Sequence, residues 1–209
     1  KRRKTTLLIG GIKMSIAYKR ILLKISGESL AGDKRHGFSS SALAATAKQI
    51  ATLNKAGVEI GVVVGGGNFW RGREGDEMDR TSADYMGMLA TVINALALSD
   101  ALDRQGVDNR VMTALAIDKI GEPYNVKTAK RYLSDGKVVV FGGGTGSPFF
   151  TTDTGASLKA CEIQAEVLLL AKNIDGIYDS DPKTNPNAKK FDTLTYDEYV
   201  EKGLRALDT

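Results

Sequence analysis

The order of apolar segments constrains the fold of this chain most strongly. Short, nearly wholly apolar segments alternate with segments whose apolar residues recur at helical spacing. Such apolar segments are typical of buried strands, and their alternation with helices indicates an α/β fold with a parallel sheet between helical layers. The predicted strands are 20–25, 58–64, 110–114, 138–141 and 166–171, and the predicted helices are 39–57, 82–104, 125–134 and 154–164.

The longest predicted helix, residues 82–104, carries apolar residues along much of its length. Helical spacing assigns the following residues to its inner face: Met88, Leu89, Val92, Leu96 and Leu102. Near the end of the chain, residues 174–190 are rich in turn formers, so we expect a hairpin with an exposed loop there.

The composition is typical of one globular domain. The chain has 209 residues, of which 42% are hydrophobic and 26% are charged. No apolar run approaches the ~20 residues of a membrane span. The single cysteine, Cys161, excludes an intrachain disulfide framework and a cysteine-built zinc site, and it fits a reducing cytoplasm. We therefore expect one cytoplasmic domain over residues 14–209, without a membrane segment.

The positive charge lies mostly in the first 13 residues. The chain has 29 basic and 25 acidic residues, and five of the basic residues but no acid fall in residues 1–13. The remainder has 24 basic and 25 acidic residues, which argues against a nucleic-acid-binding domain. Residues 1–13 can be the start of a signal peptide or an upstream extension. Their apolar part is short, ends at Lys13 and precedes no small-residue cleavage site, so we favour a disordered basic extension, with Met14 as the true start.

Three predicted strands end in turns that contain glycine: SGES, GGGNFWRG and GGGTGSPFFTTD. In a parallel sheet these turns lie at the same edge, where ligands bind. Without a Cβ atom the backbone can approach an anion closely and direct N–H groups at it. One triple glycine can be no more than a tight turn, but three such turns favour a phosphate-rich ligand. The Walker-type and dinucleotide-binding glycine fingerprints are both absent.

Several side chains near these turns have both a structural and a functional interpretation. Lys24, inside an apolar strand, can be an edge lysine in solvent or a cation beside nucleotide phosphates. Arg71 can be a solvated loop residue or a phosphate clamp, and Asp84 can be an ordinary first-turn acid or an acceptor for a ribose hydroxyl. For His36, in a polar loop, we favour solvation over a role as base or ligand, and for Trp70 we favour packing over base stacking.

Residues 145–153 (TGSPFFTTD) are the most informative stretch. Hydroxyl side chains surround the expected start of a helix near residue 154, which Thr152 or Asp153 can cap. Phe149 and Phe150 can form the wall of a base site or fill the core. A helix N-terminus with several hydroxyls around it is suited to a monophosphate.

Five segments occur in one order and at suitable spacing: YKRILLKISGESL, IGVVVGGGNFWRG, ADYMGMLATVINALAL, GTGSPFFTTD and IDGIYDSDP. Together they resemble the bacterial uridylate (UMP) kinases of the amino acid kinase superfamily, over about residues 18–208. The combination of GTGSPFFTTD with DYMGMLAT is highly specific, whereas other members of the superfamily share the glycine turns.

The resemblance implies a three-layer αβα sandwich that transfers the γ-phosphoryl group of ATP to UMP in pyrimidine biosynthesis, with Mg²⁺ delivered by ATP. It implies catalytic roles for Lys24, Arg71, Asp153 and Asp208. The ATP-binding residues that it implies are Lys24, Ile25, Ser26, Gly27, Gly67, Arg71, Lys172, Asn173, Tyr178 and Asp181. The UMP-binding residues that it implies are Gly66, Asp84, Thr145, Gly146, Ser147, Pro148, Phe149, Phe150, Thr151 and Thr152. No direct metal ligand is assigned.

The resemblance also implies a homohexamer that GTP activates and UTP inhibits. Together with its apolar content, it predicts that the long helix from Ser82 forms part of the subunit contact. The residues implied for the GTP effector are Gly32, Asp33, Lys34, Arg35, His36 and Gly37. The chain departs from the family pattern at Ser147, where asparagine is common, and at Lys137, where some members have an arginine of the effector site. The family pattern also continues through one more helix and strand after residue 209.

Two rival functions are a kinase of the same superfamily that acts on a carboxylate or carbamate, and a regulatory subunit that senses nucleotides without catalysis. The hydroxyl groups of the TGSPFFTTD stretch, around the expected helix start, favour a monophosphate acceptor. The presence of both Lys24 and Arg71 favours catalysis over sensing.

Overall fold

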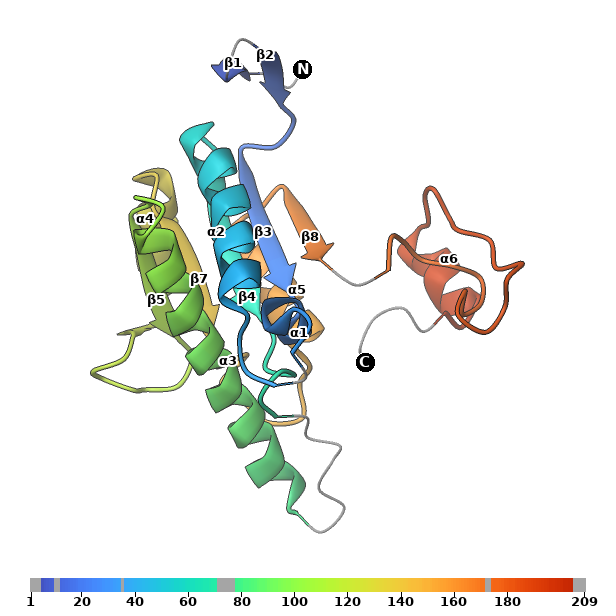
Figure 1. The fold of residues 1–209 in the computed structure, drawn as a ribbon. Helices are drawn as coiled ribbons and strands as arrows, with labels where there is room; N and C mark the ends of the chain where they lie inside the picture. Colours follow the sequence, from blue (N-terminus) through green and yellow to red (C-terminus); the bar gives the residue numbers. More distant parts are fainter. Residues whose placement is uncertain (1–4, 10–11, 35, 71–77, 172–173, 205–209) are drawn as a thin grey trace.

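The computed structural model describes residues 5–9, 12–34, 36–70, 78–171 and 174–204. Its centre is a six-stranded, all-parallel sheet in the order β6-β5-β7-β4-β3-β8 (Figure 1). The strands of this sheet are β3 (Arg20–Ile25), β4 (Glu59–Val64), β5 (Asn109–Thr113), β6 (Glu122–Pro123), β7 (Val138–Gly142) and β8 (Val167–Ala171). The predicted parallel sheet is confirmed.

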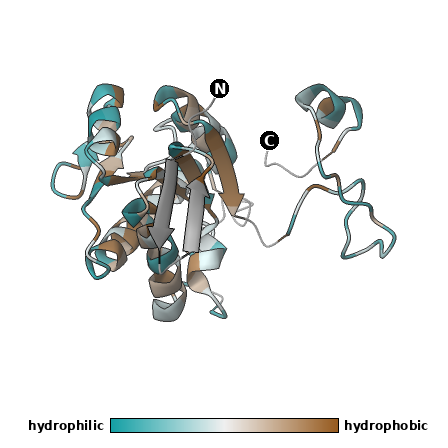
Figure 2. Cartoon of the chain, turned by 90° about the horizontal axis from the view of Figure 1, so that it is seen from above, coloured by the Kyte–Doolittle hydropathy of each residue, from teal (hydrophilic) through white to brown (hydrophobic). Residues whose placement is uncertain are grey.

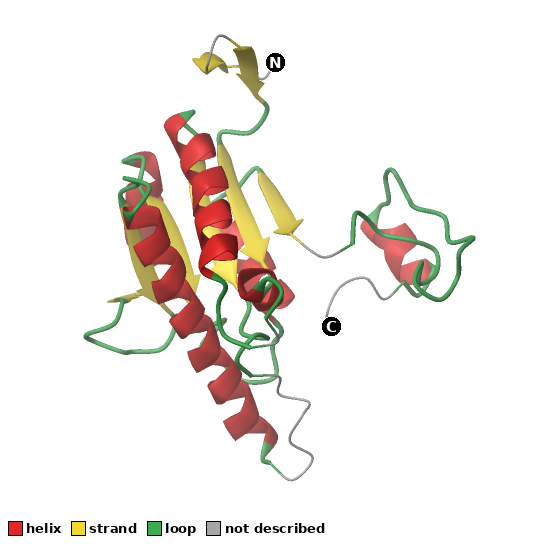
Figure 3. Ribbon diagram, in the orientation of Figure 1, coloured by secondary structure: helices red, strands yellow, loops and turns green. Residues whose placement is uncertain are grey.

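Helices cover both faces of this sheet because its central strands are apolar on both sides. In β7, Val138 and Val140 pack on one face, while Val139 and Phe141 pack on the other, as the two-residue period of a strand requires. The first face is covered by α1 (Gly27–Ala31), α2 (Ser40–Lys55) and α3 (Arg80–Asp103), and the second by α4 (Val126–Ser134) and α5 (Thr152–Glu162). Figure 3 shows the resulting layers.

Side-chain caps fix where the main helices begin. Ser39 accepts a hydrogen bond from the N–H of Ala42 at the start of α2, and Asn125 accepts one from Thr128 at the start of α4. Both caps agree with the sequence-based boundaries. Two short elements were not expected: α1 lies in the SGES turn, and β6 has only two residues. Elements of this length leave no periodic pattern to detect.

The inner face of α3 differs in part from the prediction. Met88, Val92 and Leu102 are buried, but Leu89 and Leu96 have exposed fractions of 48% and 38%. Apolar residues occupy more than one side of this helix, so spacing alone cannot identify the face that packs on the sheet. By length and composition α3 could also cross a membrane, but half of its most apolar 18-residue stretch is buried inside the structure.

The N-terminal residues form a hairpin where the sequence analysis predicted disorder over residues 1–13. Strands β1 (Thr5–Ile9) and β2 (Ile12–Ile16) pair antiparallel, with Ile9 opposite Ile12. The two segments are rich in β-branched residues, and Gly10-Gly11 between them is a dipeptide typical of two-residue hairpin turns.

Residues 174–204 lie beyond β8, to the side of the sandwich, and much of this segment is hydrophilic (Figures 1 and 2). The predicted hairpin is limited to one antiparallel bridge, between Tyr178 and Lys190. A short helix, α6 (Tyr196–Glu201), follows with a capping box formed by Thr195 and Glu198, and it has no buried residue.

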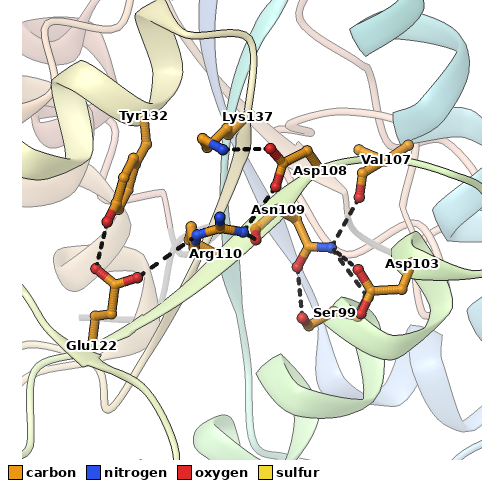
Figure 4. A network of polar contacts seen from close by, with 9 residues as sticks. All are labelled: Ser99, Asp103, Val107, Asp108, Asn109, Arg110, Glu122, Tyr132 and Lys137. Atoms are coloured by element: carbon orange, nitrogen blue, oxygen red, sulfur yellow. Dashed lines mark hydrogen bonds and ion pairs between the residues drawn. The ribbon is translucent and has the colours of Figure 1, made fainter.

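A polar network joins side chains of α3, β5, β6 and α4 with Asp108 and Lys137, which directly precede β5 and β7 (Figure 4). The amide of Asn109, a buried residue, donates to Asp103 (2.8 Å) and Val107 (3.1 Å) and accepts from Ser99 (2.6 Å). Lys137 pairs with Asp108, which lowers the pKa of that carboxyl. In the part of the chain that the structure describes, Lys137 is thus engaged in a local ion pair.

Candidate active site

An open pocket of about 570 Å³ lies at the carboxyl ends of β3, β4 and β7, where the three glycine turns come together. This is the edge at which parallel α/β sheets bind ligands. The described residues that line it are Lys24, Ser26, Gly27, Glu28, Gly65, Gly66, Gly67, Trp70, Arg80, Ala83, Asp84, Gly87, Met88, Thr91, Gly144, Thr145, Ser147, Phe150, Thr151 and Thr152. The predicted meeting of the three turns is confirmed.

Lys24 and Asp153 form a buried ion pair at this pocket. The Lys24 ammonium lies 2.9 Å from a carboxylate oxygen of Asp153, and the two side chains have exposed fractions of 8% and 7%. Lys24 comes from the end of β3 and Asp153 from the first turn of α5, where a carboxylate is also favoured by the helix dipole. Of the two interpretations of Lys24, the solvent-exposed one is therefore wrong, because the ammonium pairs with a buried carboxylate beside the pocket.

Two of the glycine turns touch each other directly. A Cβ atom on Gly27 would lie 2.5 Å from the side-chain oxygen of Asn68 and 2.7 Å from the carbonyl oxygen of Gly65. A Cβ atom on Gly66 would lie 2.8 Å from the carbonyl oxygen of Gly87 in α3. Larger residues at these positions would push the turns apart, so glycine is needed here for close approach of the backbones.

The third turn leads into the N-terminus of α5, with hydroxyl side chains at its entrance. The side chain of Thr151 caps the helix by accepting from the N–H of Thr154 at 3.1 Å. The cap is thus one residue earlier than predicted, because Thr151 is the last residue with extended backbone angles. Thr145, Ser147, Thr151 and Thr152 line the pocket, as expected for an anion site at a helix start.

Asp84 has two protein partners at the rim of the pocket. Its carboxylate accepts from the Arg80 side chain at 3.0 and 3.1 Å and from the N–H of Phe149 at 2.8 Å. Phe149 has a positive φ of 69°, a conformation that needs a specific restraint in a non-glycine residue. Arg80 was not expected from the sequence, although its spacing of four residues from Asp84 is typical of an ion pair on a helix.

The aromatic residues near the third turn do not fill the core. Phe149 and Phe150 have exposed fractions of 63% and 59%, and Phe150 lines the pocket. Trp70 also lines the pocket and donates a hydrogen bond from its indole N–H to Ala83 (3.0 Å). This exposure argues against the reading in which the two phenylalanines fill the core, and Phe150 alone of the two lines the pocket.

The other end of α5 is fixed by a second buried cation. Lys159 lies 3.6 Å from the centre of the Tyr124 ring and 3.1 Å from Glu162. The Tyr124 hydroxyl donates to Glu162 at 2.6 Å, and burial together with this carboxylate raises the pKa of Tyr124. These contacts hold α5 against the strands and so help to place Asp153.

Not every predicted site residue reaches the pocket. Tyr178 donates to Asp175 and Asp181 accepts from the N–H of Lys183, both within the segment beyond β8. Ile25 is buried under the first turn, and Gly146, Pro148 and Phe149 lie in the third turn without lining the pocket. Five predicted site residues lie outside the described part of the chain: Arg35, Arg71, Lys172, Asn173 and Asp208.

The loop predicted to serve an effector lies behind the second glycine turn. Its residues Gly32, Asp33, Lys34, His36 and Gly37 are not among those that line the pocket. The ring of His36 lies 3.2 Å from the carbonyl oxygen of Asn68, and the N–H of Gly37 donates to the same oxygen at 3.0 Å. His36 is thus a surface residue with a backbone partner.

The described residues of this pocket include two carboxylates, those of Glu28 and Asp84. Among the residues that the structure describes, no three His, Cys, Asp or Glu side chains form a cluster that could hold a metal ion. The Lys24 ammonium engages Asp153. Hard divalent cations are commonly bound by a few carboxylates together with substrate phosphates.

The chain matches proteins of known structure over most of its length. The family model described as "Amino acid kinase family" matches residues 19–209. UMP kinase from Bacillus anthracis is 38% identical, with a TM-score of 0.88 over 91% of this chain and 80% of that one. UMP kinase from Ureaplasma parvum is 37% identical, with a TM-score of 0.87 over 92% and 83%.

A third solved structure, uridylate kinase from Archaeoglobus fulgidus, is 31% identical, with a TM-score of 0.64 over 87% of this chain and 76% of that one. The family model thus covers the whole region that forms the parallel sheet, including its three glycine turns and the lysine at the end of β3. The chain belongs to the amino acid kinase family.

Proposed function

We propose that this protein is a UMP kinase, which transfers the γ-phosphoryl group of Mg-ATP to the phosphate of UMP and forms UDP and ADP. The observation that carries this proposal is the buried Lys24–Asp153 pair, 2.9 Å apart, at the point where three glycine turns meet. Similarity to two UMP kinases at 37–38% identity supports the choice of acceptor.

The acceptor chemistry needs no strong base. The attacking phosphate oxygen of UMP is already anionic, so catalysis consists of positioning the two substrates and neutralising charge during an in-line transfer. Lys24 supplies a cation at the transferring group, and Asp153 holds that cation in place. The backbone of the second glycine turn approaches the ATP phosphates, and we propose that Arg71 and Asp208 complete the charge balance.

We propose that UMP binds on the α5 side of the pocket. The hydroxyl-lined start of α5 suits its phosphate, Asp84 suits its ribose, and the third turn suits its base. In the structure Asp84 accepts from Arg80 and from Phe149, and its carboxylate has acceptor capacity left for a ribose hydroxyl. ATP would occupy the side formed by the first two turns, with Mg²⁺ arriving on its phosphates.

We further propose a homohexamer in the cytoplasm that acts in pyrimidine nucleotide biosynthesis, with GTP as activator near residues 32–37 and UTP as inhibitor. The support for a subunit contact is an exposed apolar stripe on α3. The side chains of this stripe are 38–48% exposed and recur at helical spacing: Tyr85, Met86, Leu89, Ile93 and Leu96. Such a stripe on one helix is typical of a protein–protein interface.

The proposed activity is tested by measuring ADP release from Mg-ATP with a panel of acceptors. The panel contains UMP, CMP, AMP and GMP, together with acetate and carbamate. We expect UMP to give the highest kcat/KM. ADP release that depends on a carboxylate or carbamate would instead support the rival kinase, and nucleotide binding without any ADP release would support a regulatory subunit.

A further inference from the structure

Two asparagines lie fully buried behind the glycine turns, and none of the roles discussed above involves their side chains. Asn94 is in the middle of α3 with an exposed fraction of 0%, and Asn68 follows the GGG turn with an exposed fraction of 1%. Burying an amide costs free energy unless its hydrogen bonds are satisfied, and asparagine is a poorer helix former than the residues around Asn94. A buried polar pair in an apolar helix face therefore requires an explanation.

The two amides form a closed pair that binds the backbone on both sides. The Asn94 side-chain N–H groups donate to the Gly65 carbonyl and to the Asn68 side-chain oxygen, both at 2.6 Å. The Asn68 side-chain N–H groups donate to the Gly37 carbonyl (2.8 Å) and to the Asn94 side-chain oxygen (3.0 Å). Turning either amide over would place its oxygen against a carbonyl oxygen, so the orientation of both side chains is fixed.

This pair lies where the first two glycine turns meet. The Asn68 side-chain oxygen is 2.5 Å from the position that a Cβ atom on Gly27 would take, and Gly65 is held through its carbonyl by Asn94. Gly27 and Gly65 both line the pocket. The pair thus sets how close the two turns come to each other. In this way it also sets the distance between the second turn and the end of β3, where Lys24 lies.

We propose that Asn68 and Asn94 are positioning residues for phosphoryl transfer, which hold the Gly65–Gly66–Gly67 turn at a fixed distance from the Ser26–Gly27 turn. The proposal rests on the proposed kinase function. Neither side chain is among those that line the pocket in the described part of the chain. In-line transfer depends on placing the donor and acceptor closely, and a displacement of about 1 Å can cost roughly 10²-fold in rate. Loss of the pair is therefore expected to lower kcat more than it changes either KM.

Asn94→Ala is the main test, and Asn109→Ala is its matched control. Asn109 is also a buried asparagine with several side-chain hydrogen bonds, but it lies at the opposite ends of the strands (Figure 4). Both variants lose a buried amide and should lose similar stability. For Asn94→Ala we expect kcat to fall by about 10–100-fold with KM for UMP and ATP within about threefold, whereas Asn109→Ala should keep kcat within about twofold.

Three further experiments keep the test decisive. Because the two amides act as one unit, the double variant Asn68→Ala/Asn94→Ala should be about as slow as the slower single variant, and not the product of both losses. Asn94→Ser, which retains one donor, provides a milder change if the alanine variant does not fold. Hydrogen exchange of a peptide spanning residues 65–69 should become faster in Asn94→Ala but not in Asn109→Ala, whatever the substrate.

The exchange measurement separates this proposal from the proposed function. If the wild-type protein does not phosphorylate UMP, the function is refuted, while faster exchange at residues 65–69 in Asn94→Ala still supports the positioning of the turn. Wild-type kcat in folded Asn94→Ala, an equal loss of kcat in Asn109→Ala, or unchanged exchange at residues 65–69 would each overturn the positioning role.

Discussion

Replacing Lys24 with alanine removes the cation that a buried carboxylate holds. The ammonium of Lys24 and the carboxylate of Asp153 lie 2.9 Å apart, with exposed fractions of 8% and 7%. Removing one partner of a buried pair leaves the other charge uncompensated, which costs about 3–5 kcal/mol of unfolding free energy. Removing one charge-stabilising donor from a transition state costs about 10²–10³ in kcat. Lys24→Ala should therefore lose both stability and activity.

A second variant separates these two losses. Lys24→Met combined with Asp153→Asn removes both charges, and such neutral replacements of buried pairs are often close to neutral in stability. We expect the double variant to regain most of the stability that Lys24→Ala loses. Its kcat should stay about 10²–10³ below that of the wild type, since the cation is still missing.

A matched control lies at the other end of the same strand. Arg20 and Glu59 also form a poorly exposed ion pair, 2.6 Å apart, with exposed fractions of 15% and 10%. Arg20→Met should lower stability but leave kcat within about twofold, because this pair is remote from the pocket. Urea unfolding measures stability, and ADP release is measured on protein whose circular dichroism shows it to be folded. If folded Lys24→Ala has a kcat near that of the wild type, Lys24 does not supply the catalytic cation. The same conclusion follows if the double variant regains kcat together with stability.

Three further predictions follow from the site and the surface. UMP should be preferred over CMP by at least tenfold in kcat/KM. An acceptor in residues 145–152 that pairs with the uracil N3–H would face a lone pair of cytosine, and one unpaired buried group costs ~1–3 kcal/mol. Equal values of kcat/KM would indicate a general pyrimidine kinase. Leu89→Glu with Ile93→Glu places charges on the exposed stripe of α3 and should dissociate the oligomer in light scattering, whereas a monomeric wild type would contradict the subunit contact. The hydrogen bond from Lys137 lowers the pKa of Asp108, so the pair stabilises the fold above the pKa of the unfolded chain and loses that effect as the pH falls through the lowered pKa. Lys137→Ala should therefore raise the NMR titration midpoint of the Asp108 carboxyl, and an unmoved midpoint would show that another group lowers it.

The strands and long helices could be predicted because their patterns are local. Residues 20–25 are a strand in both the prediction and the structure, and Asn125 caps α4 as its position in the sequence suggests. Lys24 and Asp153 were both candidates, but nothing local indicates that they pair. They lie far apart in the sequence, and only the packing of α5 against β3 brings them together.

What the sequence did not reveal depends on tertiary contacts. In the sequence, Asn94 is one polar residue within an apolar helix. Its contact with the Gly65 carbonyl becomes known only when the structure places the second glycine turn against α3. Leu89 was assigned to the inner face because an apolar side chain contributes to the helical pattern whether it meets the sheet or another subunit. The pairing of residues 5–9 with residues 12–16 was not predicted, because two strands of five residues leave only a short local pattern.

The most direct test of the central claim is to follow the transferred phosphoryl group itself. Phosphorus NMR of the purified protein with Mg-ATP and UMP distinguishes the β-phosphate of UDP from inorganic phosphate. We predict that UDP and ADP appear in equal amounts, that both require UMP, and that folded Lys24→Ala forms them far more slowly. ATP consumed to inorganic phosphate, or no UDP formed by the wild-type protein, would contradict the account.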